Sequence, residues 1–477
     1  MLVHALACLS ILAFPFAQKS TGEAPKPAPQ SVAQPAVESA DRLVATMPKG
    51  FAPVHMAEQI DKPAVLEYLP FTFSPDGSRV AYFGAKKDRI YGFLDDEDLG
   101  YGHKAGRPVF SENGEHVLMA YAKVNKNRSE KWTVFVDGKS VAKEDWVGPA
   151  TLAEDGNSFA YWTKPDYRLD PSGQPILTRA CLVLGHRKSK KFRRSVSEIY
   201  PWALTYSRPG LSEDGKRAIG AAQDDTGAGV LVAVGGSKDE VLHTDKGYIR
   251  ATAYSKDRKR SSFVRTVQKE NVKGYEKPET VTYPRVQLHV DGEALRVDAD
   301  ATALPSFSEN SEHYAFVYVR DEQFGIGLDG WLVEPSENMI FAARPDSTGT
   351  RIAWIEHRDG ELLQNLWLSS NSTSSVYKGK AHMCYAFAVK DDGKLILEDM
   401  EFSDPWDKIY SFELSPNEDH VAFVALEGER DLYLVCGSRK IGPFQEVDKI
   451  RWLDDETVAI GVREDREFWW RTLRVAQ

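Results

Sequence analysis

The sequence predicts an all-β fold, a single β-propeller of four-stranded antiparallel blades. A short turn phrase recurs along most of the chain, and a second turn containing glycine lies between its successive copies. No repeat contains a stretch that combines helix caps with a 3.6-residue apolar period. Aromatic residues are plentiful, with 11 Trp, 19 Tyr and 22 Phe, and they suit the half-buried faces of sheets.

The turn phrase is clearest at 74–77, where Ser-Pro-Asp-Gly precedes the apolar run Val80–Phe83. Ser and Asp cap their own backbone, Pro presets φ and Gly supplies a positive φ, so the phrase predicts a tight turn between two strands. Related phrases lie at 110–114, 152–156, 211–215, 254–257, 307–310, 344–346, 390–393, 414–417 and 453–456. Most copies are separated by 36 to 59 residues, a range that fits four-stranded propeller blades.

The second turn mark is an apolar run that enters a glycine turn. It occurs at 133–138, 231–236, 287–292, 327–330 and 432–437. Two marks per repeat predict four strands, a to d, with turns a–b and c–d. A lone blade cannot bury both of its faces, so the blades are expected to stack into a closed ring.

The phrase Ser74-Pro75-Asp76-Gly77 resembles the repeat of TolB-type, WD-like propellers, which also occur in the propeller domains of prolyl-oligopeptidase relatives. The resemblance covers about residues 66 to 477 and implies the fold, because repeat residues build turns and cores. A hydrolase domain with a Gly-x-Ser-x-Gly motif is absent from the sequence.

Eight blades fit the turn marks best, with seven or nine as the alternatives, because the interval from 390 to 415 is too short for a complete blade. The last repeat ends before a strand d. Residues 52–66 are expected to supply that strand and so to close the ring.

The chain is expected to divide into three parts. Residues 1–17 form an apolar signal peptide, too short to span a bilayer comfortably. Residues 18–48 form a disordered linker rich in Pro, Ala and Gln, and residues 49–477 form the propeller. This organisation predicts export to the periplasm, cell surface or medium, with no transmembrane segment after signal removal. Cys181, Cys384 and Cys436 lie in apolar runs and are expected to be buried thiols.

The leading functional hypothesis is a non-catalytic binding module with a protein partner. The net charge of −10 argues against nucleic acid, and no catalytic, metal or cofactor motif is visible. Two alternatives remain open. One is a propeller enzyme that acts on polysaccharide or peptide at the mouth of the central channel, and the other is a structural or cell-surface component.

Loop lengths predict where the binding face lies. The b–c loops at 164–178 and 268–284 are long, and repeat proteins carry insertions on the face that binds. The candidate binding residues are Tyr167, Arg168, Tyr275 and Tyr283 in these loops, with His103 and His357 in other expected loops. The basic run 187–194 is interpreted either as a charged c–d turn or as a contact for an anionic partner.

Overall fold

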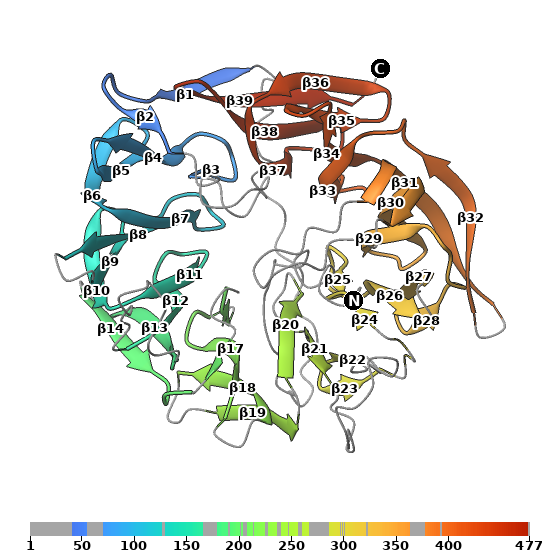
Figure 1. The fold of residues 1–477 in the computed structure, drawn as a ribbon, viewed down its shortest axis with the longest axis horizontal. Helices are drawn as coiled ribbons and strands as arrows, with labels where there is room; N and C mark the ends of the chain where they lie inside the picture. The colour runs from blue at the N-terminus through green and yellow to red at the C-terminus, as the bar shows by residue number, and fades with distance from the viewer. Residues whose placement is uncertain are drawn as a thin grey trace, which may run out of the picture.

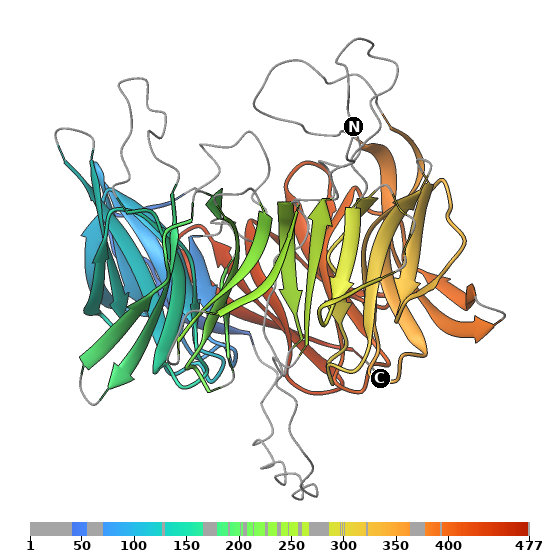
Figure 2. The ribbon, with the colours of Figure 1, turned by 90° about the horizontal axis from the view of Figure 1, so that it is seen from below.

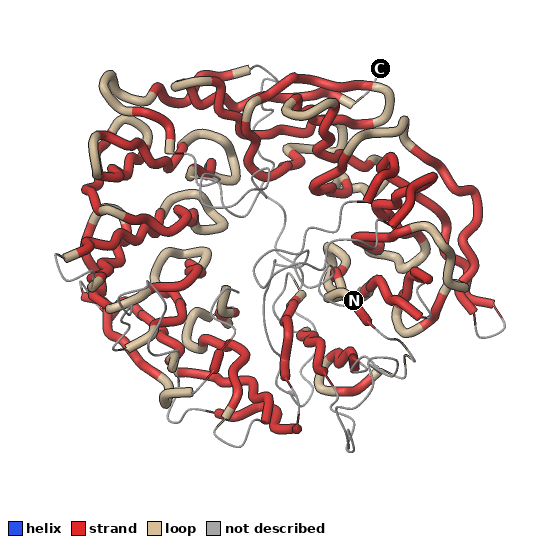
Figure 3. Tube along the Cα trace, viewed as in Figure 1, coloured by secondary structure: helices blue, strands red, loops and turns tan. Residues whose placement is uncertain are grey.

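The computed structural model describes residues 41–54 and 70–475 with internal gaps. These gaps are 126–128, 166–178, 189–190, 201, 204–207, 213, 225–227, 236–239, 247, 256–259, 267–285, 296, 298, 300, 321–322, 363–376 and 392–393. The described residues form strands and turns without a helix, as Figure 3 shows. Their strands make nine antiparallel sheets arranged around a ring (Figure 1). The fold is a single β-propeller of nine blades.

The first four blades follow the chain order around the ring. Blade 1 contains β2 (Ala52–Pro53), β3 (Phe71–Phe73), β4 (Val80–Lys86), β5 (Arg89–Leu94) and β6 (Glu97–Gly102). Blade 2 contains β7 (Lys104–Phe110), β8 (Val117–Val124), β9 (Glu130–Val136) and β10 (Lys139–Glu144). Blade 3 contains β11 (Val147–Leu152), β12 (Ser158–Thr163), β13 (Cys181–Lys188) and β14 (Lys191–Val196). Blade 4 contains β15 (Trp202–Ala203), β16 (Gly210–Leu211), β17 (Ala218–Gln223), β18 (Ala228–Val234) and β19 (Glu240–Lys246).

The remaining blades complete the ring. Blade 5 contains β20 (Tyr248–Tyr254), β21 (Ser261–Thr266), β22 (Val286–Val290) and β23 (Glu293–Ala294). Blade 6 contains β24 (Ala301–Thr302), β25 (Ser306–Phe307), β26 (Tyr314–Arg320), β27 (Gln323–Leu328) and β28 (Trp331–Leu332). Blade 7 contains β29 (Met339–Pro345), β30 (Arg351–Leu362), β31 (Tyr377–Asp391) and β32 (Lys394–Phe402). Blade 8 contains β33 (Lys408–Leu414), β34 (Val421–Glu427), β35 (Asp431–Cys436) and β36 (Arg439–Phe444). Blade 9 contains β37 (Glu446–Trp452), β38 (Thr457–Glu464), β39 (Glu467–Arg474) and β1 (Arg42–Thr46).

The blade count is nine rather than the favoured eight, and nine was one of the two alternatives. The phrase at 390–393 caused the difference. It is the c–d connection of blade 7, because Asp391 of β31 pairs with Lys394 of β32. The other nine turn phrases are a–b connections, one in each blade. The short interval from 390 to 415 therefore contains the last strand of blade 7 and the first strand of blade 8.

Strand β1 closes the ring. It pairs with β39 from Arg42↔Trp470 to Thr46↔Glu467, and it is the fourth strand of blade 9. An N-terminal segment therefore supplies strand d, as expected, but the segment is 42–46 and not 52–66. Strand β1 lies within residues 18–48, the range expected to form the linker. The closely spaced prolines of that range end at Pro35, before the strand begins. Residues 1–40 lie outside the described part of the chain.

The a–b turns have the chemistry that the sequence predicts. In blade 1 the Ser74 hydroxyl donates to the Asp76 carboxylate at 2.6 Å, and the backbone N–H of Ser78 donates to the same carboxylate at 3.0 Å. Gly77 has a φ of 66°, which a residue with a Cβ adopts only with strain. The Ser74 hydroxyl also accepts a hydrogen bond from the Arg79 backbone N–H, which links the two ends of the turn.

An aspartate in the c–d turn fastens this turn to strand b. In blade 2 the Asp137 carboxylate accepts a bond from the Val117 N–H at 3.0 Å and contacts the His116 ring at 2.8 Å. Corresponding pairs of bonds are made by Asp95 with Val80 and Arg79, by Asp291 with Ser261 and Arg260, and by Asp329 with Tyr314 and His313. Each of these aspartates has a positive φ, as the tight turn requires.

Apolar side chains fill the spaces between neighbouring blades. Where blade 1 meets blade 9, the rings of Tyr82 and Phe468 stack with centroids 4.2 Å apart, and Phe71 packs edge-on against Phe468. All three side chains are fully buried. Interfaces of this kind hold each sheet face-to-face with its neighbours, and they fix the inner strands around the ring axis.

Candidate functional site

The innermost strands are irregular in every blade. Strands β7, β11, β20, β29, β33 and β37 each contain a register shift against strand b. In blades 1, 4 and 6 the inner strand is split into two short pieces that both pair with strand b. Pro108 and Pro149 lie within two of these shifts, where a residue without an N–H is tolerated. Bulges re-aim side chains, so these positions define the chemistry near the axis.

One carboxylate near the axis joins three consecutive blades. Asp448, in the register shift of β37, accepts hydrogen bonds from the Thr72 hydroxyl at 3.0 Å and from the Phe73 N–H at 2.8 Å. Its other oxygen accepts a bond from the Arg107 guanidinium of blade 2 at 2.9 Å. The Asp448 side chain is 3 % exposed and that of Arg107 is 11 % exposed. Blades 9, 1 and 2 are thus linked at the inner edge of blade 9, the edge opposite the closing strand β1.

Positive charge gathers next to this carboxylate. Lys449, the neighbour of Asp448 in the same register shift, is partly exposed. Its pKa is held well below the usual value by removal from bulk solvent and by the positive charges of Arg208, Arg451 and Arg107, while Asp448 acts in the opposite direction. We call Arg107, Arg208, Asp448, Lys449 and Arg451 the ring-centre cluster. It carries four basic residues and one acidic residue in a chain whose net charge is −10.

The ring-centre cluster was not predicted from the sequence. Its members lie far apart in the chain, and only ring closure brings Arg107 close to Asp448. One signal was available, because Arg107 and Arg208 each precede a proline shortly before an a–b turn phrase. Because Arg107 and Arg208 occupy equivalent positions before the a–b turns of two blades, they are expected to lie at the same level along the ring axis.

Four of the expected binding residues, Tyr167, Arg168, Tyr275 and Tyr283, lie outside the described residues. Their loops do fall where expected, between strands b and c of blades 3 and 5. His103 lies in the bend between β6 and β7, where its ring accepts a bond from the Val124 N–H at 3.1 Å.

His357 lies within strand β30 and not in a loop as expected. It is buried, its ring packs on Phe341 with centroids 4.7 Å apart, and burial lowers its pKa to about 4 with help from Lys408 and His382. The neighbouring Glu356 is also buried, and its carboxylate accepts bonds from Trp354 and Asn338. The polar residues Arg351, Glu356 and Arg358 gave this stretch the composition of a loop, but blade 7 has unusually long b and c strands.

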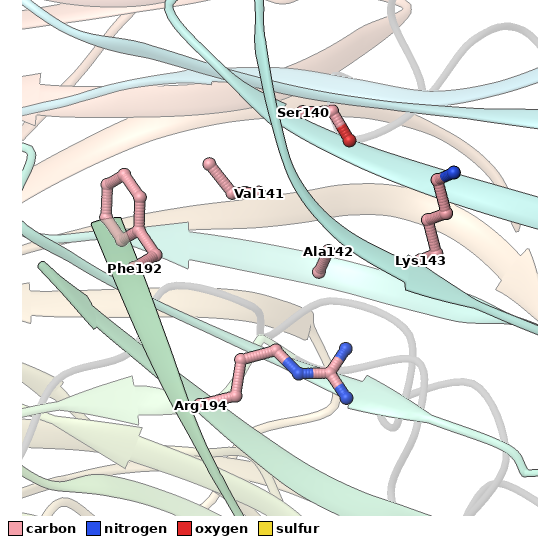
Figure 4. Close-up of a pocket in the computed structure, with 6 residues that line it drawn as sticks. All are labelled: Ser140, Val141, Ala142, Lys143, Phe192 and Arg194. Atoms are coloured by element: carbon pink, nitrogen blue, oxygen red, sulfur yellow. The ribbon is translucent and has the colours of Figure 1, made fainter. Parts of the chain in front are cut away.

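The basic run 187–194 spans the c–d hairpin of blade 3, which agrees with its interpretation as a charged turn. Beside it lies an open surface pocket of about 520 Å³ between the outer strands β10 and β14 (Figure 4). Phe192 and Arg194 point toward it from β14, and Ser140 to Lys143 line it from β10. Arg194 forms an ion pair with Glu144, so part of the positive charge at this edge is already balanced.

The three cysteines after the N-terminal segment are free and buried, and burial raises the pKa of each thiol. Within the described ranges, no group of three or more His, Cys, Asp or Glu side chains is arranged to hold a metal ion. The same ranges include no helix of the length and apolar character needed to cross a membrane.

The nine antiparallel sheets around a ring define a β-propeller. No protein-family model and no curated protein sequence matches the chain. Among solved structures, the β-propeller domain of the Trilobed protease from Pyrococcus furiosus aligns at 10 % identity, over 71 % of this chain and 94 % of that domain, with a TM-score of 0.35. A structure described as the eukaryotic initiation factor aligns at 10 % identity, over 83 % of this chain and 90 % of that chain, with a TM-score of 0.44.

A third solved structure is the Cps50 (Swd1) β-propeller domain of Myceliophteria thermophila. It aligns at 12 % identity over 66 % of this chain and 96 % of that domain, with a TM-score of 0.31. Likenesses of this size say nothing about function. The propeller assignment rests on the strand pairing of this chain.

Proposed function

We propose that the chain is a non-catalytic binding module that receives an acidic segment of a partner protein at the ring centre. The observation that carries the proposal is the ring-centre cluster. Three cations act on Lys449, and Asp448 already accepts three hydrogen bonds. A carboxylate-rich ligand would offset the repulsion among these cations.

The role of Asp448 gives less weight to the alternative of a propeller enzyme at this place. A general base needs a free oxygen within reach of the substrate. Both oxygens of Asp448 are engaged by Thr72, Phe73 and Arg107, so this carboxylate holds blades together. Polysaccharide and structural roles have no comparable observation in their favour.

Export is part of the proposal and is supported by the apolar segment 2–16. Kinship with TolB-type propellers is likewise proposed from the turn phrase at 74–77. The mass of the mature chain from the exported fraction tests the first point, because removal of residues 1–17 gives a defined loss.

Binding of a fluorescent poly-glutamate peptide to the purified chain tests the ring-centre proposal. The test variant carries Lys449→Gln with Arg451→Gln. The matched control carries Arg187→Gln with Arg193→Gln in the β13–β14 hairpin, which removes the same charge from the rival basic run. We expect the test variant to lose about tenfold in affinity and the control to keep it. We also expect binding to weaken with added salt.

The opposite pattern, with affinity lost in the control and kept in the test variant, would place the anionic contact on the basic run. Equal affinity in all three proteins, or no binding at all, would reject an acidic ligand at the ring centre. Circular dichroism of each variant shows whether a loss of affinity comes from a loss of fold.

A further inference from the structure

The outer hairpin of blade 7 extends beyond its neighbours. Strands β31 and β32 have 15 and 9 residues, and β32 is the longest outer strand in the described part of the ring. Figures 1 and 2 both show this orange hairpin reaching outward from the ring. One of its faces packs against blade 6 through Ala386, Ala388 and Leu395.

The other face begins in the core and ends in solvent. Ala381 and Met383 pack on blade 8, but Phe387 and Val389, which continue the same face, are 42 % and 38 % exposed. Ile396 of β32 lies directly opposite Val389 and is 42 % exposed. We call Phe387, Val389 and Ile396 the blade 7 patch. Contiguous exposed apolar side chains of this kind mark interaction surfaces.

The patch adjoins an open sheet edge. Strand β32 pairs with β31 on one side and is the last strand of its sheet. From Lys394 to Glu398 its register with β31 is continuous, so the free side is a regular strand edge. Among the other outer strands, β23 and β28 are short and β36 is interrupted by Gly442 and Pro443, whereas β14 pairs regularly with β13. Short length and interruption protect a sheet edge. Strand β32 has neither protection from Lys394 to Glu398, and its own register shift, with a positive φ at Asp399, follows this stretch.

The charge on this edge indicates what would pair with it. Glu398, Asp399 and Glu401 are all exposed. Lys394 and Lys390 of the same hairpin already form ion pairs with Glu334 and Asp329 of blade 6. A second copy of this chain would bring a second row of carboxylates against the first, which is unfavourable. A partner with basic residues would balance them.

We propose that β32 is a docking edge for an extended segment of a partner protein that carries an apolar residue and a Lys or Arg two positions apart, on one face of the segment. The segment adds a strand to blade 7 through main-chain hydrogen bonds. Glu398 pairs with Phe387 and therefore lies on the same face as the blade 7 patch. On that face the apolar side chains of the segment cover the patch, and its basic side chains meet Glu398. This edge is separate from the ring-centre cluster, so either site can fail its test without the other.

The probe is a short synthetic peptide of Val-Thr-Lys-Thr repeats, called the valine–lysine peptide, which places valine and lysine in turn on one face. Its binding is measured by fluorescence anisotropy. A valine–glutamate peptide tests charge, and an N-methylated valine–lysine peptide tests main-chain pairing. The variant Ile396→Lys adds a charge to the edge. Its control is Val196→Lys on the outer strand β14, since Val196 is 44 % exposed and Ile396 is 42 % exposed.

We expect the valine–lysine peptide to bind the wild type and Val196→Lys alike, and to bind Ile396→Lys about tenfold more weakly. The other two peptides should not bind. Equal binding to both variants, equal binding of the N-methylated peptide, or no binding of the valine–lysine peptide would overturn the proposal. A dimer of the wild type in sedimentation, abolished by Ile396→Lys, would instead identify a second copy as the occupant.

Discussion

The guanidinium of Arg107 in blade 2 contacts the carboxylate of Asp448 in blade 9 at 2.9 Å, and Thr72 of blade 1 donates to the same carboxylate. This contact spans the closing point of the ring. We predict that Asp448→Ala lowers the free energy of unfolding by about 3 kcal/mol, because a partly buried cation and two donors lose their acceptor. Urea unfolding measures the change. Asp419→Ala breaks the more exposed pair with Arg351 and should cost less than about 1 kcal/mol. Equal costs would contradict a special role for Asp448.

Gly77 shows a second dependence on ring closure. A Cβ at this position would lie 2.1 Å from the Trp470 side chain of blade 9. We predict that Gly77→Ala destabilises the protein through this clash in addition to the strain of its positive φ. Gly428 has a φ of 69° and nothing within 4 Å of an added Cβ, so Gly428→Ala reports the strain alone. The extra cost at Gly77 should be about 1–3 kcal/mol in urea unfolding. Equal midpoints for the two variants would show that Trp470 moves aside.

Strand β1 should contribute more to the stability of the protein than residues 1–40 do. We predict that a chain beginning at Asp41 unfolds at the same urea concentration as the chain with residues 1–40. A chain beginning at Pro48 should unfold at a lower concentration, because β39 loses its partner and the ring its closure. The comparison uses one midpoint measurement for each chain. Identical midpoints for the two truncated chains would mean that the pairing of β1 adds no stability.

The turn aspartates give the protein an acid-sensitive component of stability. Burial alone would raise the pKa of Asp76, but hydrogen bonds from Ser74 and Ser78 bring it below the usual 3.8. Its contribution is therefore complete above that value and is lost as the pH falls through the lower folded-state pKa. We predict that Asp76→Asn is less stable than the wild type at neutral pH, and that the difference shrinks in acid. Asn113 makes the equivalent bond in blade 2, so the variant should fold. A difference that does not change with pH would refute this.

Lys449 should make the stability of the protein depend on pH at values above the acid range in which Asp76 titrates. Its folded-state pKa lies well below the usual 10.5, so the unfolded chain binds more protons between these two values. Stability should rise with pH across this interval. We predict that Lys449→Met raises the unfolding midpoint at neutral pH and removes this rise, as urea titrations at several pH values would show. A lower midpoint at neutral pH would mean that the charge of Lys449 is stabilised in the fold.

Local chemistry made much of the fold predictable. The Ser, Asp and Gly of the a–b turns and the Asp-Gly of the c–d turns act within a few residues of each other, so their pattern is visible in the chain. The bond from Asp137 to the start of strand b spans 20 residues and was not foreseen. The phrase at 390–393 could not be assigned to the right connection in this way. An Asp-Gly turn has the same composition whether it follows strand a or strand c.

The candidate sites were less predictable because they depend on which blades are neighbours. The contact between Arg107 and Asp448 joins residues 341 positions apart. The run from Ala386 to Val389 has the sequence of a strand buried on both faces, and nothing in it indicates that blade 8 leaves one face uncovered. Whether Phe387 lies in the core or in solvent is determined by the length of the adjacent sheet.

The irregular inner strands have a consequence for how such a ring can change over evolutionary time. A regular strand requires alternation of buried and exposed residues, but a bulge position does not. The register shifts of this protein contain residues as different as Arg107, Gly148, Phe341, Tyr410 and Lys449. Selection can therefore replace the groups around the axis one blade at a time while the outer strands keep their pairing. The same scaffold could acquire a new ligand by a few substitutions, without a new fold.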